Sequence, residues 1–223
     1  MSKKVFLSPS NQYDNVYAYG NTTEGVQCGK IAEACKVALE RSGVDVMLMH
    51  DESMQTKCAE SNKFGADLHV PIHTNAFNGS VMGTRMFCYN TGKGMAACKA
   101  IFSRVAPLSP GTSENIQVNQ KLYEVRVPAA PTAYLECEFH DTVEGAKWIV
   151  ENTTAIGEAI AHGICDYFGV TFKEPEQTKP AKPVTTGTLY RVQVGAFAVR
   201  ENAEKMLARL KAAGFEGFIR EGK

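Results

Sequence analysis

The hydrophobic pattern of this chain changes repeatedly between the alternating period of a strand and the longer period of a helix. Apolar runs predict strands at residues 5–7, 44–49, 67–73, 84–89 and 133–139, and helical spacing predicts helices at residues 23–42, 53–64, 95–105, 141–149 and 152–168. Strands that alternate with such helices are joined by right-handed crossovers, so neighbouring strands run parallel and helices cover both faces. We therefore predict an α/β fold, a three-layer sandwich around a mainly parallel, twisted sheet.

The remainder of the chain has a different character after Gly169, which ends the last of these helices. Residues 171–188 carry spaced prolines and no periodic pattern, which is typical of an extended linker. The pattern then predicts a strand at residues 189–194, a helix at 201–212 and a strand at 215–219, a βαβ unit too small to bury a core alone. The expected organisation is a domain at residues 1–170, a linker at 171–188 and a small C-terminal module at 189–223.

Two local features of the first domain stand out. Residues 107–131 are rich in Pro, Ser, Asn and Gly and lack periodicity, which is typical of a binding loop, although residues 122–127 can hold a short element. Asp141 directly precedes the next helical pattern, so we expect it to be the N-cap of that helix.

Charge and cysteine content limit the partners and the compartment. The 24 basic residues balance 24 acidic ones, so we expect no nucleic-acid partner and no membrane association. The apolar run at residues 5–7 is too short for the core of a signal peptide, so we expect synthesis in the cytoplasm without a signal peptide. Seven cysteines without metal-binding spacing are expected to be reduced thiols in the core.

Polar side chains gather where the predicted strands end, at the usual ligand site of an α/β sheet. They are Asn11 and Gln12 after the first strand, Glu24 at the start of the first helix, His73 at the end of the third strand, Glu136 in the last strand and His140 just beyond it. Imidazole and carboxylate ligands around an open position are what a catalytic zinc ion requires, and a separate glutamate can serve as the base. Spacing alone leaves structural roles open, and Glu24 is equally placed to stabilise the N-terminus of its helix.

Other polar residues of these strands have structural interpretations. His69 lies four residues before His73 on the same predicted strand face, and we interpret it as a packed core histidine. Glu136 and Glu138 are two residues apart, so we expect them to point the same way, with at least one reaching a polar crevice.

Three segments carry a family pattern: FGADLHVPIHTNA at residues 64–76, PTAYLECEFHD at 131–141 and AIAHGICDY at 159–167. In order, they resemble the segments aDlfiSIHaNA, PavLvEvgFhdN and iA.aIa.GI..Y of the zinc-dependent N-acetylmuramoyl-L-alanine amidases of the Amidase_3 family. The similarity covers residues 3–170. It implies that Zn2+ is the cofactor, that Glu24 and His73 are zinc ligands and that Glu136 is the catalytic carboxylate. Asn75 and Gln12 are the expected substrate-binding residues.

The loop after the first strand departs from this family pattern. The family's DPGHGG loop supplies a zinc-ligating histidine, but this chain reads SPSNQ at residues 8–12, with Asn11 in the place of that histidine. An amide oxygen is a poorer zinc ligand than an imidazole. Three interpretations follow: Asn11 or Gln12 coordinates weakly, His140 or another group replaces the missing ligand, or the metal is lost and the domain only binds.

The C-terminal module carries a second family pattern. LYRVQVGAF at residues 189–197, followed by residues 201–204 and 210–215, resembles the start of a SPOR domain, a module that binds the glycan strands of peptidoglycan. The family has two βαβ halves, and we expect this chain to carry the first. Either two chains complete one module as a homodimer, or the tail is weakly folded.

Together, the resemblances imply a peptidoglycan hydrolase that cleaves the amide bond between N-acetylmuramic acid and the L-alanine of the stem peptide. The short apolar run at the N-terminus favours a phage endolysin or prophage lysin, which is made in the cytoplasm and acts on the cell wall after release. Two alternatives stay open: a non-catalytic cell-wall binding protein that has lost a zinc ligand, and a zinc carboxypeptidase-like peptidase.

Overall fold

The computed structural model describes residues 2–175, 193–212, 215 and 217–220. The chain divides into two compact units, Met1–Glu176 and Gln177–Lys223. The strands of the first unit are β1 (Lys4–Pro9), β2 (Asp45–Leu48), β3 (Leu68–Asn75), β4 (Arg85–Cys88), β5 (Asn115–Val118) and β6 (Tyr134–Phe139). Its helices are α1 (Glu24–Arg41), α2 (Met54–Phe64), α3 (Lys93–Val105), α4 (Tyr123–Arg126) and α5 (Val143–Phe168), with the 3-10 turn η1 (Ala106–Leu108).

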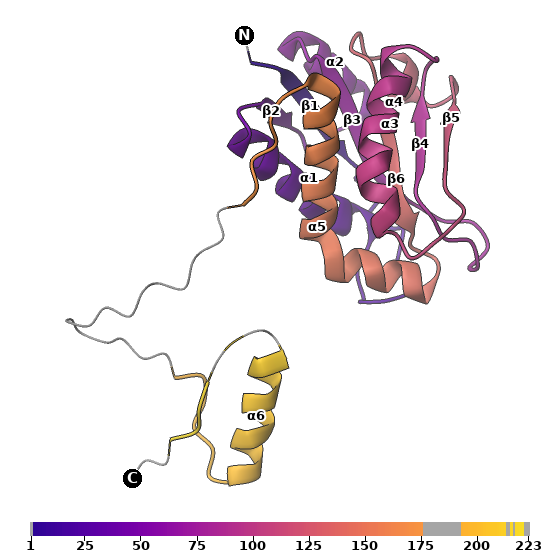
Figure 1. Cartoon of the computed structure of the whole chain (residues 1–223). Coiled ribbons are helices and arrows are strands. Elements are labelled where there is room, and N and C mark those ends of the chain that lie inside the picture. Colours follow the sequence, from indigo (N-terminus) through magenta and orange to yellow (C-terminus); the bar gives the residue numbers. More distant parts are fainter. Residues whose placement is uncertain (1, 176–192, 213–214, 216, 221–223) are drawn as a thin grey trace, which may run out of the picture. The chain divides into compact units, whose positions relative to one another are not determined.

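These strands form one sheet in the order β2-β1-β3-β6-β4-β5 (Figure 1). Neighbouring strands are parallel, except that β4 and β6 run antiparallel. The predicted α/β fold with a mainly parallel sheet is therefore confirmed. The antiparallel pair was not predicted, because periodicity shows which face a side chain occupies and not the direction of the neighbouring strand.

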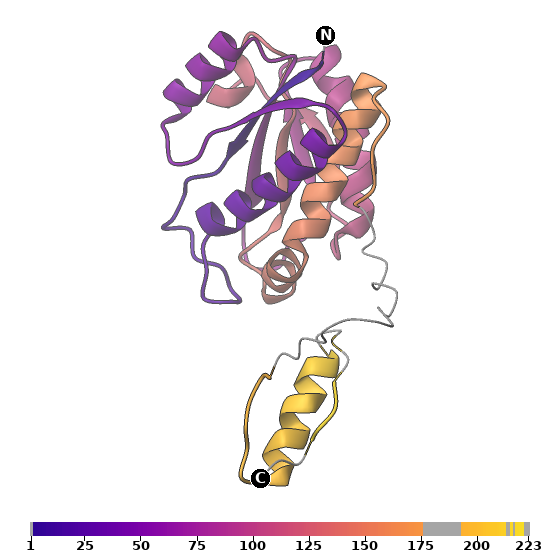
Figure 2. The same ribbon diagram turned by 90° about the vertical axis from the view of Figure 1, so that its left-hand side faces the viewer.

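Helices cover both faces of the sheet (Figures 1 and 2). Helices α1, α3 and α5 pack together on one face, and α2 and α4 lie against each other on the other face. The side chains of strand β3 alternate between the two faces of the sheet. Leu68, Val70 and Ile72 belong to the apolar core. His69 and His73 alternate with them, and His69 contacts α2 and α4. Both histidines therefore belong to the face that α2 and α4 cover.

Short elements occupy the stretch that the sequence predicts to be irregular. Strand β5 and helix α4 both lie within residues 107–131, and α4 coincides with the short element expected at residues 122–127. Each has four residues. Strand β5 was not predicted, because its two apolar residues, Ile116 and Val118, lie in a polar stretch and form no run that would indicate a strand.

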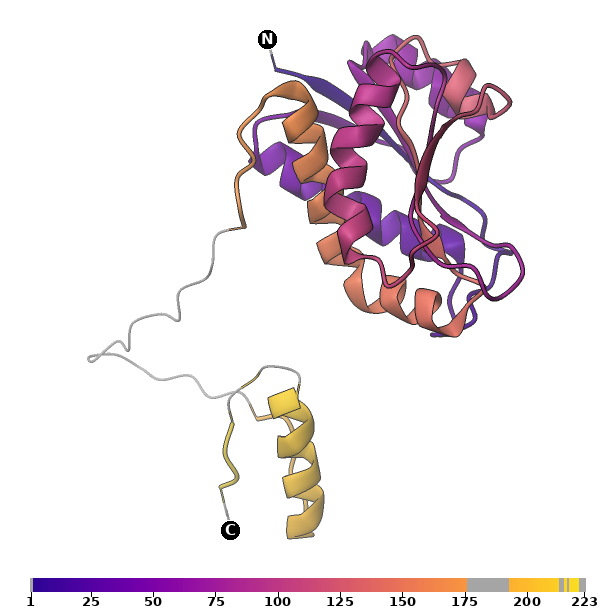
Figure 3. The same ribbon diagram turned by 45° about the vertical axis from the view of Figure 1, so that its right-hand side comes forward.

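Helix α5 joins the two helices predicted at residues 141–149 and 152–168. Asn152 has non-helical backbone angles (φ −125°, ψ 17°), and the two arms of the helix meet at an angle there (Figure 3). Within the described residues, no helix is both long enough and apolar enough to cross a membrane.

The predicted N-cap of this helix was wrong. Thr142 is the N-cap, and its hydroxyl accepts the backbone N–H of Gly145. The carboxylate of Asp141 instead accepts the backbone N–H groups of Phe77 and Gly79, at 2.9 Å and 2.8 Å. Asp141 therefore holds the loop after β3, and the next residue, Thr142, takes the N-cap position.

The described part of the C-terminal unit contains helix α6 (Arg200–Ala212), which agrees with the predicted helix at residues 201–212. The strand predicted at residues 189–194 lies mainly outside the described residues. Residues 193–194, 215 and 217–219 are described and are not in strands. A strand requires a hydrogen-bonded neighbour, which an isolated segment of this length does not provide by itself.

Candidate active site

Three of the predicted site residues meet at the carboxyl ends of the central strands. Glu24 is the first residue of α1, His73 lies near the end of β3, and Glu136 lies in β6 directly beside His73 in the strand register. The Nδ1 atom of His73 and the Oε1 atom of Glu24 are 2.9 Å apart. The fold therefore brings together residues that are 49 and 63 positions apart in the chain, since 73 − 24 = 49 and 136 − 73 = 63.

The side chain of Glu24 makes its hydrogen bonds with residues of this site, although Glu24 also lies in the first turn of α1. Its side chain is 1% exposed, and its Oε2 atom accepts a hydrogen bond from the Nδ2 atom of Asn15 at 2.7 Å. Burial opposes the ionisation of Glu24, but the hydrogen bonds with His73 and Asn15 outweigh it and lower the pKa of the carboxyl group. Burial also opposes the protonation of His73, but the hydrogen bond to Glu24 and the charge of Glu136 raise the pKa of the imidazole.

The carboxyl group of Glu136, unlike that of Glu24, has an oxygen without a hydrogen-bond partner among the described residues. This oxygen, Oε2, is buried. Burial raises the pKa of Glu136 to about 7, the charge of Glu24 adds to the rise, and the positive charges of His73 and Arg85 reduce it. A carboxyl group with this pKa exchanges a proton near neutral pH.

Arg85 is a site residue that the sequence analysis missed. It lies in β4, directly opposite Glu136 in the antiparallel register, and its Nε atom is buried without a hydrogen-bond partner among the described residues. An unpartnered donor and an unpartnered acceptor thus lie on adjacent strands. Only the direction and order of β4 place them together, and the sequence carries no signal for either.

Tyr134 was also missed. Its ring stacks on the imidazole of His73, with centroids 4.7 Å apart and planes 16° apart. The alternation of β6 places Tyr134 two residues before Glu136, on the same side of the strand. The stack fixes the plane of the histidine ring.

The loop that departs from the family pattern contributes Gln12 to the site, while Asn11 turns away. The Nε2 atom of Gln12 lies 3.4 Å from Oε1 of Glu24 and 3.5 Å from Nδ1 of His73. Asn11 is exposed, and its amide donates to the backbone oxygen of Glu52 at 3.0 Å. Gln12 is therefore the amide side chain that lies beside both predicted zinc ligands.

His140 and Asn75 make other contacts. His140 is 4% exposed and stacks on Tyr17, and its Nδ1 atom lies 2.9 Å from the hydroxyl of Thr74. Burial lowers the pKa of His140. The Oδ1 atom of Asn75 accepts the N–H of Ala76. Among the described residues, no third His, Cys, Asp or Glu brings a ligand atom within 4.8 Å of both Glu24 and His73.

Glu138 does not share the environment of Glu136, although the strand pattern predicts that both point the same way. A register shift between His73 and Asn75 interrupts the pairing of β3 with β6. Glu138 is fully buried, and its carboxylate accepts the N–H of Gly83 at 2.6 Å and the hydroxyl of Ser109 at 2.5 Å. Glu138 therefore joins the loops before β4 and after α3.

The donor set of this site fits a zinc ion in part. One imidazole and one carboxylate are oriented toward each other, the amide of Gln12 adjoins both, and the unpartnered oxygen of Glu136 lies on the next strand. A catalytic zinc ion typically has three protein ligands and one open position. An amide as the third ligand makes the site weaker than a site with two histidines.

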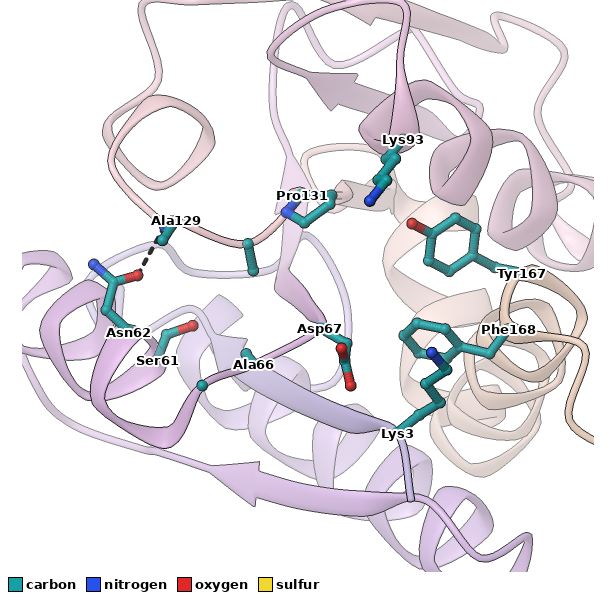
Figure 4. Close-up of a pocket in the computed structure, with 12 residues that line it drawn as sticks. Lys3, Ser61, Asn62, Ala66, Asp67, Lys93, Ala129, Pro131, Tyr167 and Phe168 are labelled. Atoms are coloured by element: carbon teal, nitrogen blue, oxygen red, sulfur yellow. Dashed lines mark hydrogen bonds between the residues drawn. The ribbon is translucent and has the colours of Figure 1, made fainter. Parts of the chain in front are cut away.

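A cavity of about 490 Å³ lies at the other end of the sheet (Figure 4). Its wall includes residues that precede β1 and β3 and residues at the end of α5, namely Lys3, Asp67, Tyr167 and Phe168. This cavity is separate from the candidate active site, because it adjoins the amino ends of the strands.

Comparisons with known proteins show what each part of the chain resembles. The family profile described as N-acetylmuramoyl-L-alanine amidase, Amidase_3, matches residues 11–166, and the SPOR domain profile matches residues 173–221, beginning within the predicted linker. The sporulation-specific N-acetylmuramoyl-L-alanine amidase of Bacillus subtilis (strain 168) is 25% identical over 224 residues, which cover 97% of this chain and 84% of that protein.

Solved structures share the fold of the first unit. The catalytic domain of CwlV, an N-acetylmuramoyl-L-alanine amidase from Bacillus (Paenibacillus) polymyxa var. colistinus, has a TM-score of 0.69 at 16% identity and covers 76% of this chain and 99% of its own. The catalytic domain of the CD27L endolysin targeting Clostridia difficile has a TM-score of 0.64 at 17% identity and covers 74% of this chain and 98% of its own. Both likenesses confirm the predicted α/β architecture.

Proposed function

The chain belongs to the N-acetylmuramoyl-L-alanine amidase family, and we propose that its reaction depends on a zinc ion held by Glu24 and His73, with Glu136 as the general base. The reaction hydrolyses the amide bond between N-acetylmuramic acid and the L-alanine of the stem peptide in peptidoglycan. The family match favours this activity over both alternatives, cell-wall binding without catalysis and a carboxypeptidase-like activity.

The contacts of Glu24 and His73 support their assignment as zinc ligands. Their ligand atoms lie 2.9 Å apart, the carboxylate is held by Asn15, and the imidazole is held by its stack on Tyr134. Gln12 is the nearest candidate for a third ligand; its Nε2 atom faces Glu24 and His73 and its Oε1 atom accepts from Asn15, so coordination through Oε1 would require the amide to turn over. When bound, the ion would polarise the scissile carbonyl group and make a water molecule at the site more acidic.

Glu136 would carry the proton during hydrolysis. Its free Oε2 atom accepts a proton from the attacking water as the water oxygen bonds to the carbonyl carbon. The same proton then passes to the alanine nitrogen as the C–N bond breaks, so Glu136 returns to its starting state. The observation that carries the proposal is geometric: Oε2 of Glu136 is buried without a hydrogen-bond partner among the described residues, and Glu136 lies directly beside His73 in the strand register.

Peptidoglycan is the substrate and the binding target that the amidase and SPOR matches imply. We propose that residues 171–188 act as a linker between the two modules and raise the concentration of the active site near the polymer. Pairing of two C-terminal modules into a homodimer stays a prediction, and sedimentation of the full chain with and without glycan strands measures it.

Purified full-length protein and insoluble peptidoglycan test the mechanism. Treatment with a zinc chelator should abolish the release of stem peptides that begin with free L-alanine, and added Zn2+ should restore it. The products separate the activities, because mass spectrometry distinguishes intact stem peptides from fragments cut within the stem. Full activity after complete removal of metal would contradict the proposed zinc dependence.

The biological setting is a separate proposal. We propose action as an endolysin or prophage lysin, and the likeness to the CD27L endolysin supports it, although another relative is a sporulation amidase. To distinguish the two settings, the protein is added to intact vegetative cells and to spore cortex, and hydrolysis of each is measured. Hydrolysis of cortex alone would contradict the lysin setting.

A further inference from the structure

A second cluster of metal-binding side chains lies on the same face of β3 as His73. It consists of Cys58 from α2, His69 from β3 and Glu124 from α4, which are 1%, 0% and 3% exposed. One ligand atom from each residue lies within 4.8 Å of the ligand atoms of the other two. We call this set the Cys58 cluster. Among the described residues, it is the single group of three such side chains that meets this distance.

Neighbouring hydroxyl groups orient the ligands of the Cys58 cluster. The Nδ1 atom of His69 lies 3.0 Å from the hydroxyl of Ser61, and its Nε2 atom lies 3.3 Å from Oε1 of Glu124. The hydroxyl of Ser8 donates to the same Oε1 atom at 2.5 Å. When His69 donates its Nδ1 proton to Ser61, the lone pair of Nε2 faces the carboxylate, as in metal sites where an outer hydrogen bond fixes the histidine tautomer.

The distance between His69 and Glu124 suits a tetrahedral zinc ion, and the thiol of Cys58 lies within 4.8 Å of both. Zinc–ligand bonds of about 2.0–2.3 Å place neighbouring ligand atoms roughly 3.3–3.7 Å apart. The separation of 3.3 Å between His69 and Glu124 already lies at this value. The thiol of Cys58 is within reach of both atoms and completes a three-residue site with one position left for a small ligand.

The charges also suit zinc in a fully buried place. A thiolate and a carboxylate together carry two negative charges, which balance one Zn2+, whereas His69 contributes a neutral imidazole. A neutral assembly avoids the cost of a buried net charge. The thiolate favours zinc over magnesium or calcium, which prefer oxygen ligands.

We propose that Cys58, His69 and Glu124 bind a second zinc ion, which ties α2, β3 and α4 together behind the active site. This site is structural, because no substrate reaches side chains that are so deeply buried. Helix α4 has four residues and lies in the long connection between α3 and β6, so a metal bond to Glu124 would hold an element that packing alone holds weakly.

Zinc binding would displace one proton from the Cys58 cluster. Burial raises the pKa of the Cys58 thiol to about 12, so the metal-free cluster holds a neutral thiol at neutral pH. Zinc binding replaces that proton, which leaves to solvent, and forms one Zn–S bond. No oxidant or reductant takes part.

The chemistry of sulfur distinguishes this site from the active site. His69 and His73 are four residues apart along β3, or about 13 Å, so one ion cannot serve both places. The groups proposed for the active site are the carboxylates, imidazole and amide of Glu24, Glu136, His73 and Gln12, and none of them is a thiol. A metal–sulfur signal that is lost in Cys58→Ser therefore reports the Cys58 cluster, whatever the outcome for the proposed catalytic zinc ion.

Cobalt titration of the reduced, metal-free full-length chain is the test. The wild type should develop a near-ultraviolet thiolate-to-cobalt charge-transfer band that saturates at one equivalent. The band should persist in the double variant Glu24→Gln, His73→Asn, disappear in Cys58→Ser, and remain in Cys98→Ser, a matched buried cysteine of α3. No band in the wild type, or an unchanged band in Cys58→Ser, would overturn the proposal.

A second measurement requires no variant, in case Cys58→Ser fails to fold by circular dichroism. X-ray absorption of the wild type loaded with zinc should show sulfur in the first shell at about 2.3 Å. A shell of nitrogen and oxygen alone would overturn the proposal.

Discussion

The active site and the Cys58 cluster each combine a histidine of β3 with a glutamate of a neighbouring element, yet their carboxylates Glu136 and Glu124 are in opposite states. Glu136 in the active site has an unpartnered oxygen and a raised pKa, whereas Glu124 in the Cys58 cluster accepts a hydrogen bond from Ser8 and lies 3.3 Å from Nε2 of His69. Burial opposes ionisation of Glu124 too, but the hydrogen bond and charge of His69 outweigh it and lower the pKa of Glu124.

The difference shows how one face of the sheet can hold both a reactive carboxylate and a stabilising carboxylate. A buried carboxylate that lacks hydrogen-bond donors is costly in its charged form, and this cost is what makes it a base near pH 7. A buried carboxylate with its donors in place favours the folded state. Glu136→Gln should therefore stabilise the metal-free protein, whereas Glu124→Gln should destabilise it.

Glu136→Gln should have the largest effect on activity, a loss of roughly 10²–10⁴-fold in kcat, because the proton carrier is removed. It should also stabilise the metal-free protein. The pKa of Glu136 rises from 4.5 to about 7 on folding, so folding stability falls as pH increases through this interval and stays low above it. The gain should reach up to about 3 kcal/mol above pH 7 and vanish below pH 4.5.

Urea unfolding at pH 5 and pH 8 measures this gain, with peptide release as the activity assay. Glu144→Gln, an exposed glutamate in the first turn of α5, is the matched control and should change neither quantity. Equal stability of Glu136→Gln and the wild type at pH 8 would contradict the environment assigned to Glu136.

His73→Ala should reduce kcat/KM by roughly 100-fold or more and remove one equivalent of bound zinc. It leaves the carboxylate of Glu24 buried without its ion-pair partner, so it should also cost about 3–5 kcal/mol of stability. Metal analysis and thermal unfolding measure these effects. His50→Ala is the control, since His50 pairs with the exposed Glu33 at the surface. Retention of two zinc ions by His73→Ala would contradict its role as a ligand.

Glu124→Gln should destabilise the metal-free protein at pH 7 by about 1–3 kcal/mol, the opposite sign to Glu136→Gln. The pKa of Glu124 is lowered on folding, so its contribution is complete above its unfolded value and disappears as pH falls through its folded value. The difference from the wild type should therefore shrink in acid. A urea series from pH 3 to pH 7 tests this, and a constant difference across the series would count against it.

Arg85→Met should have the smallest effect, a shift of the acidic limb of the pH profile of kcat/KM. Arg85 lowers the pKa of Glu136, so its removal should move the limb from about pH 7 to a higher pH by roughly one unit. Activity at pH 9 should change little. Arg104→Met is the control, because Arg104 pairs with Asp166 in an exposed place. An unchanged profile would show that Arg85 does not act on Glu136.

Much of the fold could be predicted from the sequence because its signals are local. The strand and helix periods placed nearly every long element, and His73 could be identified because it ends an apolar run. Strand β5 was missed because its two apolar residues lie in a polar stretch, whereas β2 and β4, which also have four residues, lie in clear apolar runs. The N-cap at Thr142 was missed because the carboxylate of Asp141 instead accepts two backbone N–H groups of a distant loop.

The sequence by itself determined the α/β class and the family, because each depends on local period or on a motif, and the same motifs predict Glu24, His73 and Glu136 as site residues. Tertiary structure alone decided that Gln12 and not Asn11 lies beside the ligands, that Arg85 faces Glu136, and that Cys58, His69 and Glu124 converge. The physical reason is that these contacts depend on the order and direction of strands and on loop paths. Such long-range choices follow from packing of the whole chain and leave no periodic trace in the sequence.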